Sequence, residues 1–499
     1  MEQQLIDDIA AAADGALDDK RPDAVSAARA AGRLTARERI ARLVDSESFV
    51  EYGVLAGRTS AADDDGPGDG LICGSATVHE MPVVVLASDR SVAEGTQSDR
   101  NQRKAARLLQ AAEQERWPVV LLLDGDGARP GDARWSPPIM VAPRGRYGLL
   151  DGLAQLNGWV PTVACVLGKT LDGETAAALM CDFSVATTAA ELGARQDGSD
   201  VARGAVDYAR RGDVDLVVED EDAAIAAARQ YLHFHGPDAA HWTVSPDYPH
   251  IADIIPENRR RPYDMRGVIS AFADQDSVLE LRPDYGRSML TVLARLNGRP
   301  VGIFANQPKS PLAGSIDPPA ADKAARFVEL CDAYGFPLVS FVDNPGYMVG
   351  PQSEAEGMAR HHARPLASLH ARRVPLCSVQ IRKAYGLGPY AMSGWGSSHN
   401  APLLKLAWPS VESGGMSLEG AAYLVKRKEI RAAASAEEAL AIRNAYADKM
   451  RESTTGLRAG RSFQFDDIIA PNQTRERIGR MLGRTRTARP ATPRYIDLI

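Results

Sequence analysis

The chain alternates short apolar runs with longer amphipathic stretches, and it does so in two separate series. In the first series the apolar runs cover residues 71–78, 82–87, 118–123, 161–167 and 181–186, with helical spacing over about 98–116, about 149–158 and from near 173. In the second series the runs cover residues 288–296, 300–305, 337–342 and 375–381, with helical spacing over 319–334 and 356–372. Helices between apolar runs act as crossovers between parallel strands. The pattern therefore predicts two α/β units with largely parallel sheets.

The two series are an internal duplication. The sequence KAAR at Lys104 recurs at Lys323, and Pro118, Asp124 and Gly127 recur as Pro337, Asp343 and Gly346, each pair being 219 residues apart. In both copies a helical stretch precedes a proline, an apolar run and a glycine-rich strand end. We therefore expect two domains of one fold, residues 1–240 and residues 241–499.

The segment ahead of the first series predicts helices. Residues 1–33 are alanine-rich and are interrupted at Arg21-Pro22. Thr35 followed by Glu38 has the spacing of a capping box, in which each side chain caps a backbone N–H of the first helical turn. We expect a helix to begin there and a strand to follow it.

Composition narrows the function classes. The 499 residues are 44% hydrophobic and 25% charged with a formal charge of −7, so nothing electrostatic favours nucleic-acid binding. The start of the chain lacks the basic and apolar regions of a signal peptide, and no apolar segment reaches the roughly 20 residues that span a bilayer. The five cysteines form no CxxC pair, and the histidines of residues 233–250 lack a compact ligand spacing. We expect a cytoplasmic protein with reduced thiols and no metal.

Glycine-rich turns follow the predicted strands at three places, namely residues 124–129 with their repeat at 343–347, residues 168–174 and residues 382–388. Glycine lets backbone N–H groups approach a ligand at a strand end, and a helix N-terminus beyond it adds positive potential. Paired N–H groups would stabilise the oxyanion of a thioester enolate. The alternative is that these glycines serve only the backbone of the turns. None of the three turns is a P-loop or a GxGxxG fingerprint.

Several segments together resemble one family. TARERIARLVDSESFVEYG, NGRPVGIFANQP, DPPAADKAARFVELCDAYGFPLVSFVDNPGYMVG, MARHHAR, RKAYGLG and AWPS occur in that order. They resemble motifs of the carboxyltransferase (β) subunit of biotin-dependent acyl-CoA carboxylases, the propionyl-CoA carboxylase-like family. The resemblance runs from about Thr35 to Ile430 and is most specific in the second half.

The resemblance implies a fold and a reaction. It implies two tandem crotonase-like domains of the α/β class, the N-terminal one taking an acyl-CoA and the C-terminal one taking carboxybiotin. CO2 would pass to the α-carbon of the acyl-CoA through an enolate, with an oxyanion hole in each domain and with biotin N1 as the base.

The resemblance also implies partners. The chain lacks a Met-Lys-Met biotinylation site and an ATP-binding carboxylase module, so biotin is expected on a partner, a biotin carboxylase/biotin carboxyl carrier (α) subunit. The expected assembly is a homo-hexamer or a mixed hexamer with a paralogous β subunit, without nucleic acid and without a membrane.

In the C-terminal domain the family's KAYGGAY corresponds to KAYGLGP at residues 383–389. The resemblance implies an oxyanion hole made by the backbone N–H groups of Leu387 and Gly388, because a backbone donor survives a change of side chain. Substrate-binding roles are implied for Gly346, Tyr347, Lys383, Tyr385, Gly386 and Tyr390. Tyr390 either lines the acyl pocket or packs in the core.

In the N-terminal domain the family's GPCAGGA corresponds to residues 168–174 and its SGGAR to residues 125–129. The resemblance gives Asp172 and Gly173 to the oxyanion hole, and Gly127 and Ala128 to substrate binding. Asp126 and Asp172 stand where the family has glycine. A carboxylate beside a developing enolate would oppose the charge that the hole must stabilise.

These carboxylates leave alternatives open. Asp172 and Glu174 either point away from the site or are protonated, or this half has a different chemistry. We expect Glu174 to face the surface at a helix start, with a general base as the alternative. The resemblance therefore implies a carboxyltransferase component of an acyl-CoA carboxylase, with an acyl-CoA decarboxylase or a non-catalytic scaffold β subunit paired with an active paralogue as the alternatives.

Overall fold

The computed structural model describes residues 2–57, 67–129, 148–196, 199–259, 261–394, 401–453, 455–485 and 490–498. The chain forms two compact units, Met1–Gly236 with Ala491–Leu498, and Pro237–Pro490. The sequence placed the division between residues 240 and 241, four residues after the boundary between Gly236 and Pro237. It also assigned residues 491–498 to the second half. These residues instead return to unit 1, where Ile496 exchanges two hydrogen bonds with the side chain of Asn157.

Unit 1 is built on one mixed sheet in the order β1-β2-β3-β4-β5-β6-β9, with β7 and β8 attached to β5. The strands are β1 Val50–Glu51, β2 Leu71–Val78, β3 Met81–Ser88, β4 Val119–Gly125, β5 Thr162–Leu171, β6 Phe183–Thr187, β7 Glu191–Gln196, β8 Ser199–Gly204 and β9 Leu216–Val218. The pairs β1–β2 and β2–β3 are antiparallel, and β3 to β9 along this path are parallel. The hairpin of β7 and β8 was not foreseen, because its strands are short, polar and exposed.

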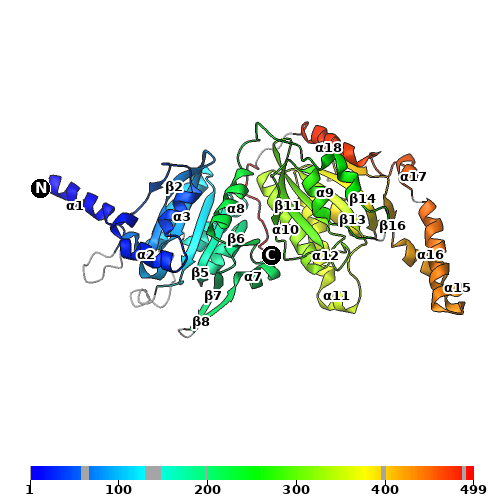
Figure 1. The fold of residues 1–499 in the computed structure, drawn as a ribbon, viewed down its shortest axis with the longest axis horizontal. Helices are drawn as coiled ribbons and strands as arrows, with labels where there is room; N and C mark the ends of the chain where they lie inside the picture. Colours follow the sequence, from blue (N-terminus) through cyan, green and yellow to red (C-terminus); the bar gives the residue numbers. More distant parts are fainter. Residues whose placement is uncertain are drawn as a thin grey trace. The chain divides into compact units, whose positions relative to one another are not determined.

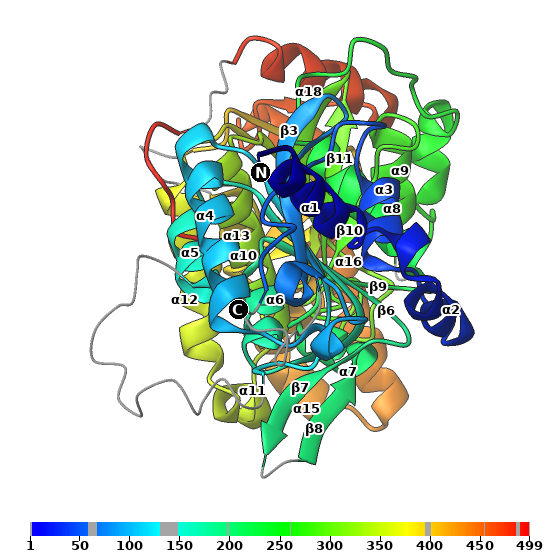
Figure 2. The ribbon, with the colours of Figure 1, turned by 90° about the vertical axis from the view of Figure 1, so that its left-hand side faces the viewer.

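Helices cover both faces of this sheet (Figures 1 and 2). The helices of unit 1 are α1 Glu2–Asp14, α2 Pro22–Ala30, α3 Ala36–Leu43, α4 Asp99–Glu115, α5 Leu149–Leu156, α6 Gly173–Met180, α7 Ala205–Arg211 and α8 Glu221–His233. Neither α1 nor α2 buries a residue. In Figure 2, α4 and α5 lie on one side of the sheet, and α3 and α8 lie on the other. The predicted capping box of Thr35 and Glu38 is confirmed at the start of α3.

Unit 2 repeats the plan with a sheet in the order β10-β11-β12-β13-β14-β15-β17, and β16 pairs with β14. Its strands are β10 Leu279–Leu281, β11 Met289–Leu296, β12 Arg299–Asn306, β13 Leu338–Asn344, β14 Leu376–Tyr385, β15 Leu404–Ala407, β16 Glu412–Gly414 and β17 Asp467–Ile468. Its helices are α9 Met265–Phe272, α10 Pro318–Tyr334, α11 Pro351–Ala355, α12 Met358–Ala371, α13 Gly388–Ser393, α14 Leu418–Val425, α15 Arg427–Ala432, α16 Ala436–Ser453, α17 Gly456–Arg461 and α18 Thr474–Leu482.

The duplication extends to individual hydrogen bonds. Lys104 Nζ donates to the backbone oxygens of Gly68 and Leu71 in unit 1. Lys323 Nζ donates to three backbone oxygens in unit 2, at 2.7 to 3.0 Å. The β4–β5 and β13–β14 ladders both shift register at the strand end, between Leu123 and Gly125 and between Val342 and Asn344. The repeated lysine therefore connects α4 to the start of β2 in unit 1, and α10 to the segment that leads into β11 in unit 2.

None of the helices in the described ranges combines the length and the apolar character that a membrane crossing requires. The longest helix, α16, carries charged residues along most of its length.

Candidate functional site

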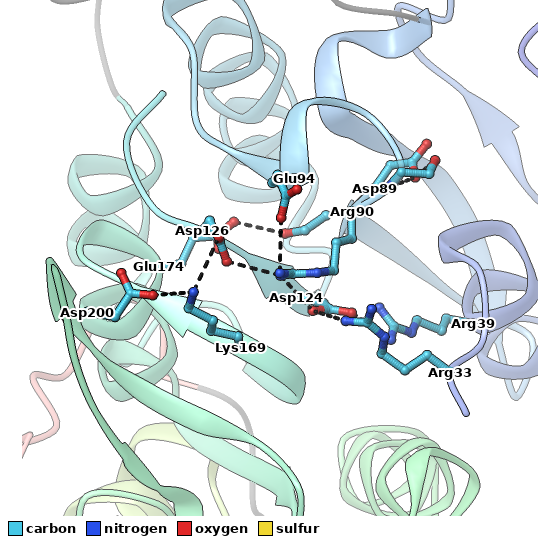
Figure 3. Close-up of polar contacts among 12 residues, drawn as sticks. Arg33, Arg39, Asp89, Arg90, Glu94, Asp124, Asp126, Lys169, Glu174 and Asp200 are labelled. Carbon is cyan, nitrogen blue, oxygen red and sulfur yellow. Dashed lines mark hydrogen bonds and ion pairs between the residues drawn. The ribbon is translucent and has the colours of Figure 1, made fainter. Parts of the chain in front are cut away.

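In unit 1 the carboxyl end of β4 carries Asp124, a buried carboxylate surrounded by arginines (Figure 3). Arg39 Nη2 donates to Asp124 Oδ2 at 3.0 Å, and Arg39 also forms a two-point contact with Glu221 at 2.7 and 2.8 Å. Arg90 Nη1 lies 3.4 Å and Arg33 Nη1 lies 3.7 Å from Asp124 Oδ1. The charge of this strand-end aspartate is therefore compensated by cations from other elements.

Asp126, two residues further on, joins a second group of charges (Figure 3). Its carboxylate lies 3.1 Å from Arg90 Nη1, 3.4 Å from Lys169 Nζ and 3.8 Å from Arg195 Nη2. Lys169 and Arg195 both pair with Asp200 of β8, and the contact with Asp200 raises the pKa of Lys169. This network ties the β7–β8 hairpin to the ends of β4 and β5.

Asp172 follows β5 with φ 53° and ψ −119°, a conformation that favours glycine. Its backbone N–H donates to Gly193 O at 2.9 Å, so the amide expected in the oxyanion hole is engaged in the sheet. Its carboxylate accepts the N–H of Arg195 at 2.8 Å and lies against the Cα of Gly127, where a Cβ would collide with it. The carboxylate thus fills the space above Gly127.

Glu174 is buried, with 4% of its surface exposed, so the expectation that it faces the surface is wrong. Its Oε1 accepts a hydrogen bond from Ser88 Oγ at 2.8 Å, and its Oε2 packs against Gly125. Burial, with Asp124 nearby, raises the pKa of Glu174 to about 8. The carboxyl is therefore largely protonated at neutral pH, as one of the alternatives from the sequence required.

The other predicted residues of unit 1 lie beside this turn. Gly127 O accepts the N–H of Gln97 at 2.7 Å, and Ala128 forms a parallel bridge with Gln97. Gly173 and Glu174 begin α6, and among the described residues neither of their amides has a hydrogen-bond partner. First-turn amides of a helix lack partners within the helix. The structure thus brings Gly127, Ala128 and Gly173 together.

A cavity of about 360 Å³ adjoins the same strand end. Its polar wall includes Arg33, Arg90 and Asp124, and its apolar wall comes from α2 and from Ile72. Arg21, just before α2, donates to Asp89 and to Ser91 at 3.1 and 2.8 Å, which holds α2 over the cavity. Apart from Asp124, the polar wall was not singled out from the sequence, because Arg33 and Arg90 come from segments far apart in the chain.

In unit 2 the equivalent aspartate is Asp343, at the end of β13. It is fully buried and accepts hydrogen bonds from Arg382 Nε at 2.8 Å and Tyr263 OH at 2.9 Å. The backbone N–H of Lys383 also donates to it, at 3.2 Å, and Lys383 Nζ lies 3.8 Å away. Burial next to Asp343 raises the pKa of Tyr263 well above its ordinary value.

The turn after β14 has the backbone of a donor site. Gly386 has φ 59° and donates its N–H to Gly414 O at 3.0 Å, whereas the amides of Leu387 and Gly388 have no partner among the described residues. A Cβ on Gly388 would lie 2.7 Å from the Asn344 side chain, so this turn requires a residue without one. Asn344 Oδ1 in turn accepts the N–H of Gly346 at 2.6 Å.

A cavity of about 680 Å³ lies at this turn. Its lining residues are Val342, Ser378, Gln380, Ala384, Gly386, Leu387, Pro389, Tyr390, Ser393, Lys405, Ser413, Gly414, Gly415, Gln464 and Phe465. Tyr390 thus lines a cavity in unit 2. Ser378, Gln380 and Lys405 were not singled out, although a lysine inside the apolar run LKLAWP is itself a signal.

Two predicted tyrosines have mainly packing contacts. Tyr385 OH contacts Glu412, whose other oxygen accepts Arg451 Nε at 2.8 Å, so this tyrosine links β14 to α16. Tyr347 OH donates to His362 O at 3.3 Å, and the two rings meet edge to face. Burial raises the pKa of both tyrosines, which keeps them neutral.

The family description "Carboxyl transferase domain" matches residues 27–493. The methylmalonyl-CoA carboxyltransferase 12S subunit of Propionibacterium freudenreichii is 32% identical, covering 93% of this chain and 90% of its own length. The biotin-dependent long chain acyl-coenzyme A carboxylase beta4 subunit of Mycobacterium tuberculosis is also 32% identical, covering 89% of this chain and 87% of its own length.

Two solved structures of related enzymes match the fold of this chain. A transcarboxylase 12S crystal structure, described as a hexamer with methylmalonyl-coenzyme A and methylmalonic acid bound, matches with a TM-score of 0.82 and 30% identity, over 98% of this chain and 96% of that one. A single-chain, multi-domain long-chain acyl-CoA carboxylase matches with a TM-score of 0.87 and 36% identity over 95% of this chain, which spans about half (48%) of that protein. The chain therefore belongs to the carboxyl transferase family of biotin-dependent acyl-CoA carboxyltransferases, and its two units are tandem crotonase-like domains, as the sequence predicted.

Proposed function

We propose that this carboxyltransferase moves the carboxyl group of carboxybiotin, carried by a partner protein, to the α-carbon of an acyl-CoA. The observation that carries the proposal is the pair of amides at Leu387 and Gly388, which have no hydrogen-bond partner in the described part of the chain and lie beside the 680 Å³ cavity of unit 2. Two N–H groups that point at one site stabilise charge developing on a carbonyl oxygen. A ureido ring has such an oxygen, and its size suits a cavity of this volume.

Unit 2 would hold the ureido ring with its own residues. The amides of Leu387 and Gly388 bind the ureido oxygen, Tyr390 and Phe465 provide flat apolar walls, and Lys383 supports Asp343 beneath the turn. Gly346, Tyr347, Tyr385 and Gly386 set the backbone of the two adjoining turns. When bound, biotin supplies the carboxyl group and, after its release as CO2, the base that takes the α-proton.

Unit 1 would bind the acyl-CoA thioester at the amides of Gly173 and Glu174, beside Gly127 and Ala128. These amides follow Asp172, whose N–H is engaged with Gly193 O, in the way that Leu387 and Gly388 follow Gly386. A protonated Glu174 places no negative charge near the enolate oxygen. The Asp172 carboxylate is held by Arg195 N, in the space above Gly127.

We further propose a biotin carboxylase/biotin carboxyl carrier subunit as partner and a hexamer, either of this chain alone or mixed with a paralogous β subunit. A relative is described as a hexamer in its solved structure. All five cysteines are buried free thiols, which suits the reducing cytoplasm.

The experiment is a carboxylation assay with the co-purified biotin-carrying partner, ATP and labelled bicarbonate, run across acetyl-, propionyl-, methylcrotonyl- and long-chain acyl-CoA. The expected result is ATP-dependent label in at least one acyl-CoA, with none when the partner is left out. Label that never leaves the biotin carrier, with every acyl-CoA tried, would contradict the proposal.

Two observations favour second candidates. The methylmalonyl-CoA decarboxylase subunit alpha of Veillonella parvula is 30% identical over 90% of this chain, which favours a decarboxylase as a second candidate. Release of CO2 from malonyl- or methylmalonyl-CoA would indicate that activity.

The Asp126 and Asp172 carboxylates at the unit 1 turn favour a scaffold β subunit, which would be inactive alone and would co-purify with a second β subunit. Turnover by the isolated chain would exclude the scaffold.

A further inference from the structure

The unit 2 cavity has a polar row on one side, made by three neighbouring strands. Ser340 of β13 pairs with Ser378 of β14, and Ser378 pairs with Lys405 of β15. Side chains at one register of adjacent strands point to the same face of a sheet. Ser340 Oγ donates to Ser378 Oγ at 2.9 Å, and both Ser378 and Lys405 line the cavity. The row therefore ends in a cationic side chain at the cavity wall.

Lys405 lies in mixed surroundings. Its Nζ is 5.0 Å from the centre of the Phe465 ring, which lines the same cavity. Its backbone N–H donates to Asp466 Oδ2 at 2.7 Å, and this acid is the charged group that acts on it. Burial lowers the pKa of Lys405 to about 8 and Asp466 opposes that shift, so the ammonium form still predominates at neutral pH. Lys405 is partly buried, and an ammonium in such a place attracts an entering anion more strongly than a fully exposed one does.

We propose that Lys405 is the counter-ion for a carboxylate that enters the unit 2 cavity on a ureido ring. The amides of Leu387 and Gly388 would hold the ureido oxygen, and Lys405 would hold the carboxylate attached to the ring nitrogen. The inference rests on the proposed function, which makes that ligand the carboxyl donor. Lys405 forms no covalent bond in this scheme and acts as a binding residue that discriminates the carboxylated ring from the bare ring.

A pair of small probes tests this without turnover. 2-Imidazolidone is a neutral cyclic urea, and 2-imidazolidone-1-acetate is the same ring with a stable carboxylate on a nitrogen substituent. Ligand-observed NMR titrations of the full chain should show the acetate binding roughly 10- to 100-fold more tightly, as expected for a hydrogen-bonded charge pair. Lys405→Met should abolish the difference, and Lys405→Arg should retain most of it. Equal binding of the two probes to the unaltered chain, or a difference that survives in Lys405→Met, would overturn the proposal.

Two matched variants separate charge from packing. Lys426→Met removes a lysine that also lies over an aromatic ring, that of Tyr446, but outside the cavity, and it should leave the probe difference unchanged. Phe465→Leu removes the ring beside Lys405 and keeps the charge, so the difference should remain. Its loss in Phe465→Leu but not in Lys405→Met would assign the discrimination to the ring instead.

Carboxyl transfer from malonyl-CoA to free biotin gives a second readout. Lys405→Met should slow this transfer by about 10-fold or more while the KM for malonyl-CoA stays the same, because the change affects only the biotin side. An unaltered chain that transfers nothing from malonyl-CoA or from the carboxylated forms of the other acyl-CoAs tried would contradict the proposed function, and the probe titration would still decide the role of Lys405. A chain that transfers normally with Lys405→Met would contradict the Lys405 proposal alone.

Discussion

The turn at residues 172–174 in unit 1 and the turn at residues 386–388 in unit 2 occupy the same place in their domains. Each follows the longest strand of its sheet, and each begins with a residue at positive φ, 53° for Asp172 and 59° for Gly386. That residue donates its N–H to a neighbouring strand, to Gly193 O in one turn and to Gly414 O in the other. In both turns the next two amides have no hydrogen-bond partner within the ranges that the structure describes. The duplication therefore preserves the backbone of a donor site twice.

The side chains around the two turns differ. In unit 2 the first two residues of the turn are Gly386 and Leu387, and the Leu387 side chain is 53% exposed beside an open cavity. In unit 1 the carboxylate of Asp172 covers Gly127, and the carboxyl of Glu174 is buried against Gly125. The comparison teaches that a backbone can retain the geometry of an oxyanion hole while its side chains change the local charge. Substitutions at the two turns can show whether the backbone or the side chains control activity.

The largest effect is expected from removing one amide donor. Leu387→Pro removes the N–H at a residue whose φ of −83° is close to that of proline. Loss of one oxyanion donor lowers kcat by about 10²- to 10³-fold, so carboxyl transfer should fall by that factor. Leu387→Ala keeps the amide and should retain near-normal kcat with an unchanged melting temperature. Equal activity of the proline and alanine variants would show that this amide is not a donor in the reaction.

The second prediction compares the repeated lysines. Lys323→Met leaves three buried carbonyl oxygens without their donor, and Lys104→Met leaves two, so both variants should be destabilised. We expect a loss of about 1 to 3 kcal/mol for Lys323→Met, the cost of leaving buried acceptors unsatisfied, and a smaller loss for Lys104→Met. Urea denaturation of both variants measures the difference. A larger loss for Lys104→Met would contradict the ranking by the number of carbonyls.

The sequence predicted the strands and helices of the duplication better than the surroundings of the side chains at their ends. Apolar runs located β2, β3, β4, β12 and β13 to within a few residues, because buried strands leave continuous apolar runs and the helices between them leave helical spacing. The β7–β8 hairpin left no such signal, and with it Arg195 and Asp200 were missed. The resemblance to a family gave the positions of Leu387 and Gly388. It did not reveal that Glu174 is buried, because burial depends on how Gly125 and Ser88 pack around it.

The third prediction concerns the buried carboxyl of Glu174. Its pKa of about 8 in the folded chain exceeds the value of 4.5 expected when unfolded, so the folded state binds the extra proton. The contribution of this carboxyl to the free energy of unfolding should therefore be most favourable below pH 4.5. It should fall by at most about 1.4 kcal/mol per pH unit as the pH rises towards 8. Glu174→Gln removes this contribution, so its stability relative to the unaltered chain should increase across that window. Glu94→Gln, at an exposed glutamate that pairs with Arg90, should show no such trend. Parallel pH curves for Glu174→Gln and the unaltered chain would mean that Glu174 is ionised when folded.

The smallest effect is expected from the strained residue of the unit 1 turn. Asp172→Gly and Asp172→Ala both lose the hydrogen bond to Arg195 N, but only glycine relieves the positive φ. The glycine variant should therefore be more stable than the alanine variant by about 1 kcal/mol, which is the usual cost of such a conformation. Both variants uncover Gly127, so if the Asp172 carboxylate hinders the thioester, both should lower the KM for acyl-CoA. A KM that rises in both variants would instead make the carboxylate a substrate contact, and the unit 1 turn would then differ from the unit 2 turn in its ligand as well as in its charge.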